Sequence, residues 1–487
     1  MSKLKNTFVK LDLPRPHNLR VDVLSGLTVS LALVPEAIAF SFIADVDPKV
    51  GLYAAFMVGL ITAIFGGRPG MISGATGAVA VIFAPMIADQ IGIHDRATAT
   101  QYLFAAVILM GVFQMIFGFL KLGKFIRLVP HPVMLGFVNG LAIVICIAQF
   151  TMFKEGPRDA KTWLMGKDLW IMVAMVALTM AISWKLPKLT KAIPATLAAI
   201  VTVSLLAVAL DHYGIHHSRT VMDFVRDSST AAVKPTTIAA SMPTFGLPSL
   251  PTGWSATLQI IAIPALLAAL VGLIASLMTL SLVDEITQTR GRGNKESLAQ
   301  GLANITNGFF GGMGGCAMIG QSMINIRGGG RGRTSGITAA LCLLGFILYG
   351  ASLIEAIPLA ALVGVMFMVV IGTFEWSSFR VLKNIPRSDA FVLILVSATT
   401  VIVDLAVAVL VGIIVSALVF AWRKGSKMDA TVSLEEGTTK VYKLEGYLFF
   451  GSATSFKDLF DIANDPEHVV IDFENSRVYD HSGLEAI

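Results

Sequence analysis

The stretch MISGATGAVAV (Met71–Val81) decides the fold class, because it places two glycines, a serine and a threonine inside one of the most apolar parts of the chain. It follows FGGRPG (Phe65–Gly70), whose glycines and proline disfavour one continuous helix. In a bilayer, a break in a helix is tolerated only where the freed backbone is buried in protein or lines a cavity. We therefore interpret the run as a deliberately broken membrane segment.

The composition places most of the chain in a membrane. Of its 487 residues, 55% are hydrophobic and 14% are charged, whereas soluble domains carry roughly 25% charged residues. Repeated apolar runs of about 20 residues are long enough to cross ~30 Å of hydrocarbon. These features predict an all-α polytopic membrane protein. The net charge of +5 is spread over short loops and gives no signal of nucleic-acid binding.

Breaks of charged or Gly/Pro-rich sequence divide the apolar part into fourteen predicted segments. They lie at about 21–43, 50–66, 76–91, 101–120, 131–150, 168–184, 192–210, 257–282, 297–313, 318–328, 334–355, 358–373, 388–403 and 405–421. The third and the tenth are the plainest cases of segments too short for a full crossing. We predict an N-terminal segment (1–20), a transmembrane domain (21–424) and a soluble strand–helix–strand region (425–487).

Lysine and arginine gather in loops that share one side of the predicted membrane. The clearest clusters are KLGKFIR (121–127), WKLPKLTK (184–191), RGRGNK (290–295) and RGGGRGR (327–333). The positive-inside rule then places both termini in the cytoplasm and the loop 211–255 outside. The basic, polar N-terminus predicts no cleavable signal peptide.

The opening stretch has a partner in GCAMIGQSMIN (Gly315–Asn325), again a glycine-rich break before a short apolar helix. Matching Ala75–Ala78 with Met318–Gln321 makes each stretch the third of seven segments. Seven is odd, so the halves, about 21–210 and 257–421, run in opposite directions as inverted repeats. Such paired short segments point to a transporter's binding site. The alternative is close packing of small residues.

Two helices that begin near mid-membrane would turn free N–H groups and positive dipole ends toward one cavity. That arrangement attracts a small anion without a buried lysine or arginine. Thr76 and Ser322 would add hydroxyl donors, and Gln321 an amide donor. The pattern favours anions over cations.

Glu36, in ALVPEAIAFSFIAD, is one ionisable residue placed well inside a predicted span. A carboxylate at that depth is costly and is a functional candidate by default. We predict that Glu36 carries a proton. The alternative is a protonated or hydrogen-bonded structural residue that stabilises a break at Pro35.

Five ordered motifs resemble the SulP family of inorganic anion transporters, the prokaryotic relatives of animal sulfate and anion exchangers. They are GLTVSLALVPEAIAFSFIA, DPKVGLYAAFMVGLITAIFGGRPGMISGATGAVAV, LVDEITQTRGRGNKESLAQGLAN, GGMGGCAMIGQSMINIRGGGRGRTSG and DHSG. The resemblance covers essentially the whole chain. It implies a seven-plus-seven inverted repeat like the uracil permeases, a core domain that moves against a gate domain as an elevator, a cytoplasmic STAS domain and a homodimer.

The same resemblance implies an anion site between segments three and ten, closed by segments one and eight. Its substrate-binding residues would be Thr76, Gly77, Ala78, Phe40, Met318, Ile319, Gly320, Gln321 and Ser322, and its coupling-ion residues Glu36, Ala275, Ser276 and Thr279. Two positions depart from the family pattern. Many eukaryotic members have arginine at Gln321, and prokaryotic members usually have an acid at Ala275. A Na⁺ site near Thr279 would lack that carboxylate.

The C-terminal region resembles the beginning of a STAS domain and stops at Ile487, so we expect a partial domain. Ser482 resembles the regulatory serine of bacterial STAS proteins; its alternative role is that of a helix N-cap. A cytoplasmic regulator that binds through this domain is a further expectation.

Together these features predict a multi-pass transporter of the bacterial inner membrane. We expect it to carry sulfate or bicarbonate, coupled to H⁺ or Na⁺ or by exchange, with no enzymatic activity, no cofactor and no metal beyond a weak Na⁺ site. The rivals are a nucleobase permease of the same fold, which would be expected to have carboxylates in segments eight and ten, and an anion channel.

Overall fold

The computed structural model describes most of the chain. The described residues are 19–121, 130–155, 162–189, 195–214, 216–228, 241–251, 253–384, 386–402, 405–425, 428–435 and 439–487. The predicted N-terminal segment 1–20 therefore lies outside the described residues except at its last two positions.

Within the described residues, the N-terminal half contains seven long or medium helices, with a very short strand between the second and third. In chain order they are α2 (Leu19–Ile43), α3 (Pro48–Phe65), β1 (Ser73–Ala75), α4 (Gly77–Ile93), α5 (Arg96–Phe119), α6 (His131–Gln149), α7 (Gly166–Leu189) and α8 (Ala195–His212). The turn after α6 is followed by the hairpin β2 (Lys154–Glu155) and β3 (Thr162–Trp163), and α9 (Val221–Ser228) lies in the predicted outer loop.

The second half repeats this order. It contains α10 (Trp254–Thr287), α11 (Gly293–Phe309), β4 (Gly315–Ala317), α12 (Ile319–Arg327), α13 (Arg333–Tyr349), α15 (Leu359–Thr373), α17 (Arg387–Ile402) and α18 (Leu405–Gly425), with the short α14 (Ala351–Glu355) and α16 (Ser377–Asn384) as connectors.

Helices occupy all fourteen positions that the apolar runs predict. Eight of the described helices are long and apolar enough to cross a membrane, and α4 and α13 are shorter apolar helices. The helical, polytopic character is thus confirmed, while fourteen full crossings stay a prediction. Helix α2 passes through Pro35 without ending, so the structure contains no break there for Glu36 to stabilise.

Local sequence explains several helix starts. Asp47 caps α3 by accepting a hydrogen bond from the Lys49 N–H at 3.0 Å, and Pro48 occupies the first helical position, where its missing N–H costs nothing. Asp95 caps α5 in the same way by accepting from the Thr98 N–H.

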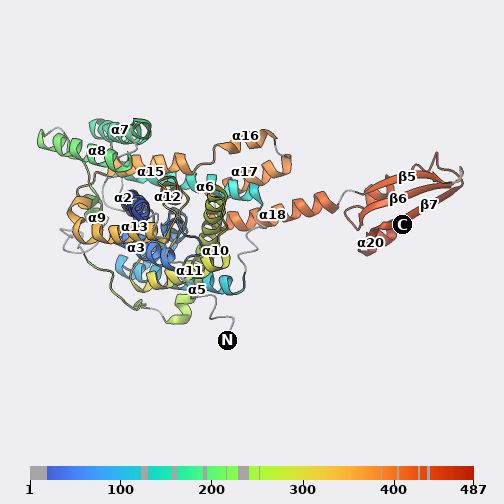
Figure 1. The fold of residues 1–487 in the computed structure, drawn as a ribbon, viewed down its shortest axis with the longest axis horizontal. Coiled ribbons are helices and arrows are strands. Elements are labelled where there is room, and N and C mark those ends of the chain that lie inside the picture. The colour runs from blue at the N-terminus through green and yellow to red at the C-terminus, as the bar shows by residue number, and fades with distance from the viewer. Residues whose placement is uncertain are drawn as a thin grey trace.

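The helices pack as two groups (Figure 1). One group, which we call the core group, is α2, α3, α4, α5, α10, α11, α12 and α13. The other, the gate group, is α6, α7, α8, α15, α17 and α18. Within each group the packing is reciprocal, because a contact made by a helix of the first half has a counterpart made by the corresponding helix of the second half. The contact of α2 with α13 corresponds to that of α10 with α5, and the contact of α6 with α17 corresponds to that of α15 with α7. This reciprocity is the pattern expected of two repeats related by a two-fold axis.

The region after α18 forms a separate three-stranded sheet to one side of the helical body (Figure 1). Strands β5 (Asp429–Glu435) and β6 (Thr439–Leu448) pair antiparallel, and β6 pairs parallel with β7 (His468–Val478) across the crossover that contains α19 (Ala453–Lys457). Helix α20 (His481–Ala486) ends the chain. The assignment of residues 425–487 to a STAS domain stays a prediction.

A close crossing in the core group brings α5 and α11 into backbone contact at Gly111 and Gly301. A Cβ added at Gly301 would lie 2.7 Å from the Gly111 carbonyl oxygen and from the Met115 nitrogen. At Gly345 on α13, by contrast, an added Cβ meets nothing within 4 Å.

We predict that Gly301→Val lowers the thermal unfolding temperature in detergent strongly, because overpacking a helix contact costs about 1–3 kcal/mol or more. Gly345→Val is the matched control, since it adds the same side chain to a helix without a clash. Equal unfolding temperatures for the two variants would contradict this packing.

Candidate substrate site

Strands β1 and β4 form a two-stranded antiparallel ladder in the interior of the core group. Ser73 pairs with Ala317, Gly74 with Cys316 and Ala75 with Gly315. All six residues are buried. The ladder satisfies backbone groups that two broken membrane segments would otherwise leave without partners in an apolar interior.

Small residues are required at the ladder because neighbouring backbone approaches closely. A Cβ at Gly315 would lie 2.3 Å from the Gly74 carbonyl oxygen. The glycines of the two motifs thus permit strand pairing and do not merely weaken a helix.

A row of polar side chains on α11 holds both strands. Glu296, Gln300, Asn304 and Asn307 are spaced four, four and three residues apart, so they share one helix face, and each is 0% exposed. Asn304 donates to the Gly315 carbonyl and accepts from the Gly315 N–H, both at 2.9 Å. Gln300 donates to the Ser73 hydroxyl at 2.9 Å. We call these four residues the α11 polar row.

The ends of the α11 polar row fix the turns beside the strands. Glu296 accepts from the Gly67 N–H at 2.7 Å and from Gln300 at 2.8 Å. Asn307 donates to the Met313 carbonyl at 2.5 Å. This row is not among the residues predicted from the sequence, although polar residues at three- and four-residue spacing within an apolar segment are a visible signal.

Helices α4 and α12 begin directly after the two strands. Thr76 and Met318 are their N-cap residues, and neither side chain caps the helix with a hydrogen bond. Because the strands are antiparallel, the two helix N-termini lie at opposite ends of the short ladder. Each N-terminus carries about half a positive charge and free N–H groups.

The ladder register corrects the sequence alignment of the two motifs. Thr76 corresponds to Met318 and Gly77 to Ile319, one position away from the alignment that paired Thr76 with Ile319. The sequence could not fix this register, because both motifs contain several small residues in a row.

The first turns of the two helices differ in exposure. On α12, Ile319 is 38% exposed and an added Cβ at Gly320 would meet nothing within 4 Å. On α4, Gly77 and Ala78 are buried, and a Cβ at Gly77 would lie 2.8 Å from the Phe40 ring and 2.9 Å from Ile145 of α6. Phe40 therefore covers the start of α4, at the boundary with the gate group.

Glu36 and Gln321 meet at the start of α12. The Gln321 Nε2 donates to Glu36 Oε1 at 2.5 Å, and the two side chains are 8% and 2% exposed. The Gln321 Oε1 is buried without a hydrogen-bond partner among the described residues. The structure thus brings the predicted proton carrier into contact with a predicted substrate-binding residue from the other repeat.

The other predicted hydroxyl groups already have partners. Ser322 accepts from the Ile72 N–H at 2.9 Å, and Thr76 contacts the Cys316 sulfur at 3.2 Å. On α10, Ser276 accepts from the Ala317 N–H at 3.1 Å, and Thr279 donates to the Ala275 carbonyl at 2.8 Å. Ser276 and Ser322 therefore tie their helices to the ladder.

Buried charge is scarce near the ladder. The buried charged residues of the described chain are Asp22, Glu36, Arg68, Glu296 and Arg333. Both arginines are engaged elsewhere: Arg68 lies 3.2 Å from Asp284, and Arg333 donates to the carbonyls of Ala63 and Gly66. Of these five side chains, Glu36 is the one that hydrogen-bonds a residue in the first turn of α12.

Ser482 lies far from this site, in α20. It is exposed, and the N-cap of α20 is Asp480, which accepts from the Gly483 N–H at 2.8 Å. The alternative that Ser482 caps a helix is therefore wrong, because the preceding aspartate takes that position. A regulatory role for Ser482 stays a prediction.

Comparison with known proteins identifies the family to which the chain belongs. The model of the sulfate permease family matches residues 19–396. The YbaR protein of Bacillus subtilis, provisionally named a sulfate transporter, is 43% identical over 96% of this chain and 91% of its own length. This chain belongs to the sulfate permease family.

A bicarbonate transporter is similar to this chain in sequence, and a solved domain of such a transporter is similar to it in structure. The bicarbonate transporter BicA of Picosynechococcus is 31% identical over 94% of this chain and 83% of its own length. The solved transmembrane domain of a cyanobacterial BicA superposes with a TM-score of 0.68, at 29% identity, over 82% of this chain and 98% of that domain.

The fold extends to distant animal proteins. The structure of the murine anion transporter solute carrier 26 family member A9 superposes with a TM-score of 0.79 over 100% of this chain and 86% of its own, at 16% identity. At 16% sequence identity, this structural similarity shows a shared fold and nothing about substrate.

We predict that Asn304→Leu unpairs β4 and weakens anion binding by the folded protein. The variant leaves the N–H and carbonyl of Gly315 without partners, at about 1–3 kcal/mol for each buried group. Hydrogen exchange of residues 315–317, together with anion affinity measured by calorimetry, checks this.

Thr306→Val is the control, because Thr306 donates only to the Leu302 carbonyl of its own helix. If Asn304→Leu retains wild-type exchange protection at 315–317, the α11 polar row does not hold the strand.

Proposed function

We propose that this protein is a secondary transporter of a small inorganic oxyanion, sulfate first and bicarbonate second, that works by alternating access. The observation that carries the proposal is the pair of half-helix N-termini held at a buried ladder without a lysine or arginine among the described residues around them. Partial positive charges attract an anion yet bind it weakly enough for release.

The relatives support this substrate class. One is provisionally named a sulfate transporter and another a bicarbonate transporter. Both names are those of transporters, which points away from an enzyme. A nucleobase permease is disfavoured, because Ala275 and the run from Gly315 to Asn325 offer no carboxylate for a uracil-like ring.

Proton coupling follows from the contact between Glu36 and Gln321. A charged Glu36 at the start of α12 competes with the substrate anion for the same helix dipole and the same amide. A neutral Glu36 removes that repulsion, so anion binding and proton binding favour each other. The proposed cycle carries a proton and an anion inward together and releases both in the cytoplasm.

Sodium coupling is less well supported. The hydroxyls of Ser276 and Thr279 already bond to backbone groups, and Ala275 brings no carboxylate to neutralise a cation. We therefore propose H⁺ as the coupling ion, with no other cofactor.

The two helix groups suggest how the site changes sides. The ladder, α4 and α12 belong to the core group, while Ile145 of the gate group touches the start of α4. We propose that the core group carries the anion past the gate group as an elevator. A homodimer, placement in the bacterial inner membrane with cytoplasmic termini, and a regulator that binds residues 425–487 complete the proposal.

Glu36→Gln is predicted to abolish the stimulation of uptake by an inward proton gradient, while anion affinity is retained or rises, because the uncharged amide does not repel the anion. Glutamine keeps an acceptor for Gln321 but cannot titrate. Couplings of 1–3 kcal/mol correspond to about 5–150-fold stimulation, so the loss is measurable as labelled sulfate uptake in proteoliposomes.

Glu285→Gln, at the exposed cytoplasmic end of α10, is the control and should retain the stimulation. Unchanged proton dependence in Glu36→Gln removes the role of Glu36. A large conductance with no saturation would instead show an anion channel.

Ala275→Glu should create a dependence on Na⁺ that the natural chain lacks. The new carboxylate would stand one helical turn from Thr279 and supply the missing negative ligand. Uptake with Na⁺ and proton gradients imposed separately measures this, and strong Na⁺ stimulation of the unmodified chain would contradict proton coupling.

A further inference from the structure

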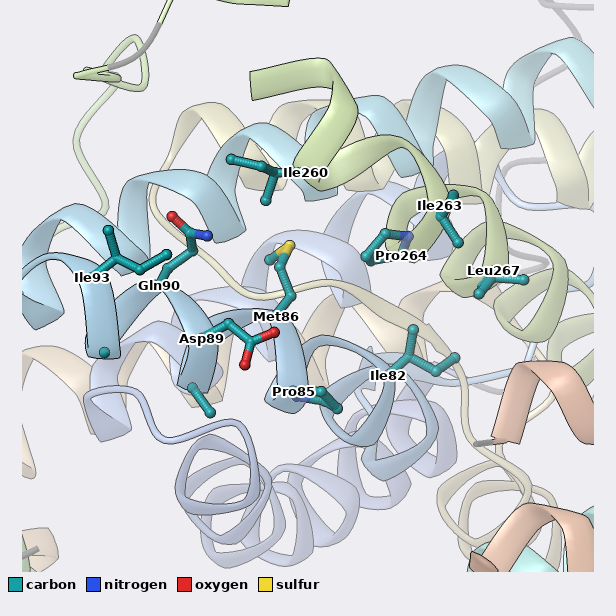
Figure 2. A pocket seen from close by; sticks show the side chains of 12 residues that line it. Ile82, Pro85, Met86, Asp89, Gln90, Ile93, Ile260, Ile263, Pro264 and Leu267 are labelled. Atoms are coloured by element: carbon teal, nitrogen blue, oxygen red, sulfur yellow. The ribbon is translucent and has the colours of Figure 1, made fainter. Parts of the chain in front are cut away.

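A groove of about 810 Å³ lies between the second half of α4 and the first half of α10, away from the ladder (Figure 2). Its walls are mostly apolar, from Ile82, Met86 and Ile93 on α4 and from Ile263 and Leu267 on α10. Figure 2 shows Ile82 and Leu267 at one end, with Gln90 and Ile93 at the other.

The length of the groove matches one leaflet of a membrane. If α4 begins near the bilayer centre, a rise of 1.5 Å per residue puts Ile82 about 8 Å and Asp89 about 18 Å from the centre. Half of the hydrocarbon core is ~15 Å thick. The apolar walls therefore lie at the depth of an acyl chain, and Asp89 lies at the depth of a lipid headgroup.

The headgroup end of the groove is rich in hydrogen-bond acceptors. Asp89 is an exposed carboxylate, and Gln90 is 4% exposed with an Oε1 that has no partner among the described residues. Pro264 has no N–H to give to the carbonyl of Ile260, four residues earlier. The lining includes no lysine or arginine.

From this geometry we propose that the groove binds a phospholipid with a primary ammonium headgroup, of the phosphatidylethanolamine type. The ammonium has three N–H donors for the Asp89 carboxylate, the Gln90 amide oxygen and the Ile260 carbonyl. One acyl chain lies along Ile82, Met86 and Leu267. The bound lipid belongs to the leaflet on the side where α4 ends and α10 begins, which the charge bias predicts to be the outer leaflet.

The same chemistry argues against other occupants. An anion that entered through this groove would meet a carboxylate and uncompensated acceptors, which repel it. A choline headgroup is cationic but has no N–H donor, and a glycerol headgroup is not cationic. The proposal does not rest on the proposed anion transport, because the residues that line the groove belong neither to the ladder nor to the first turns of α4 and α12.

Native mass spectrometry of the purified full-length chain tests the proposal. The probes are phosphatidylethanolamine, phosphatidylcholine and phosphatidylglycerol with identical dioleoyl chains, added separately at matched concentration. We expect phosphatidylethanolamine to bind about tenfold more tightly than either of the others, since hydrogen bonds to charged groups are the strong ones.

The Asp89→Asn variant should lose this preference, with phosphatidylethanolamine falling to the level of phosphatidylcholine. Ile263→Trp, which fills an apolar wall, should weaken all three lipids together. Glu355→Gln, an acid at the end of α14, is the matched control and should retain the preference.

Unfolding temperatures in lipid-free detergent confirm that the variants are folded before lipids are compared. Equal binding of the three lipids by the natural chain overturns the proposal, as does an unchanged preference in folded Asp89→Asn. Faster anion uptake by Asp89→Asn would also overturn it, because it would identify the groove as an anion entrance.

Discussion

Ser73–Ala75 and Gly315–Ala317, two segments more than two hundred residues apart, exchange backbone hydrogen bonds across the interior of the core group. Interrupting two membrane helices frees N–H and carbonyl groups that hydrocarbon cannot satisfy, and the ladder supplies partners for them. The α11 polar row completes the arrangement, since Asn304 bonds both backbone groups of Gly315 and Gln300 bonds Ser73. Because α4 and α12 begin directly after the two strands, the fixed ladder also fixes the positions of their N-termini.

This constraint bears directly on the proposed anion site. Two fixed half-helices provide partial positive charge without a buried cation, so in the proposed site the substrate is not held by a full opposite charge. In the proposed mechanism, Glu36 is the part of the site whose charge changes. It contacts Gln321 at the start of α12, where its charge and the substrate's charge compete. The same contact joins a residue of the first half of the chain to a residue of the second half.

The sequence predicted the elements well and their contacts less well. All fourteen apolar runs coincide with helices, and both short helices begin within a residue of the predicted positions. The three-residue strands were not predicted, because such short segments carry no period and their pairing partner lies in the other repeat. The alignment of Thr76 with Ile319 was one residue off, since consecutive small residues leave the register undetermined. The row Glu296, Gln300, Asn304 and Asn307 was visible in sequence, but nothing there showed what it holds.

Hydropathy and glycine placement determined by themselves that this chain is a helical membrane protein with two matched breaks, because the length of an apolar run and the residues that interrupt a helix are properties of local sequence. Five ordered motifs likewise determined the family. Only the tertiary structure decided that Glu36 meets Gln321, that Ser322 and Ser276 bind backbone, and that Asp89 and Gln90 end an apolar groove. Those contacts join helices from different parts of the chain, and their distances depend on how the two repeats pack together.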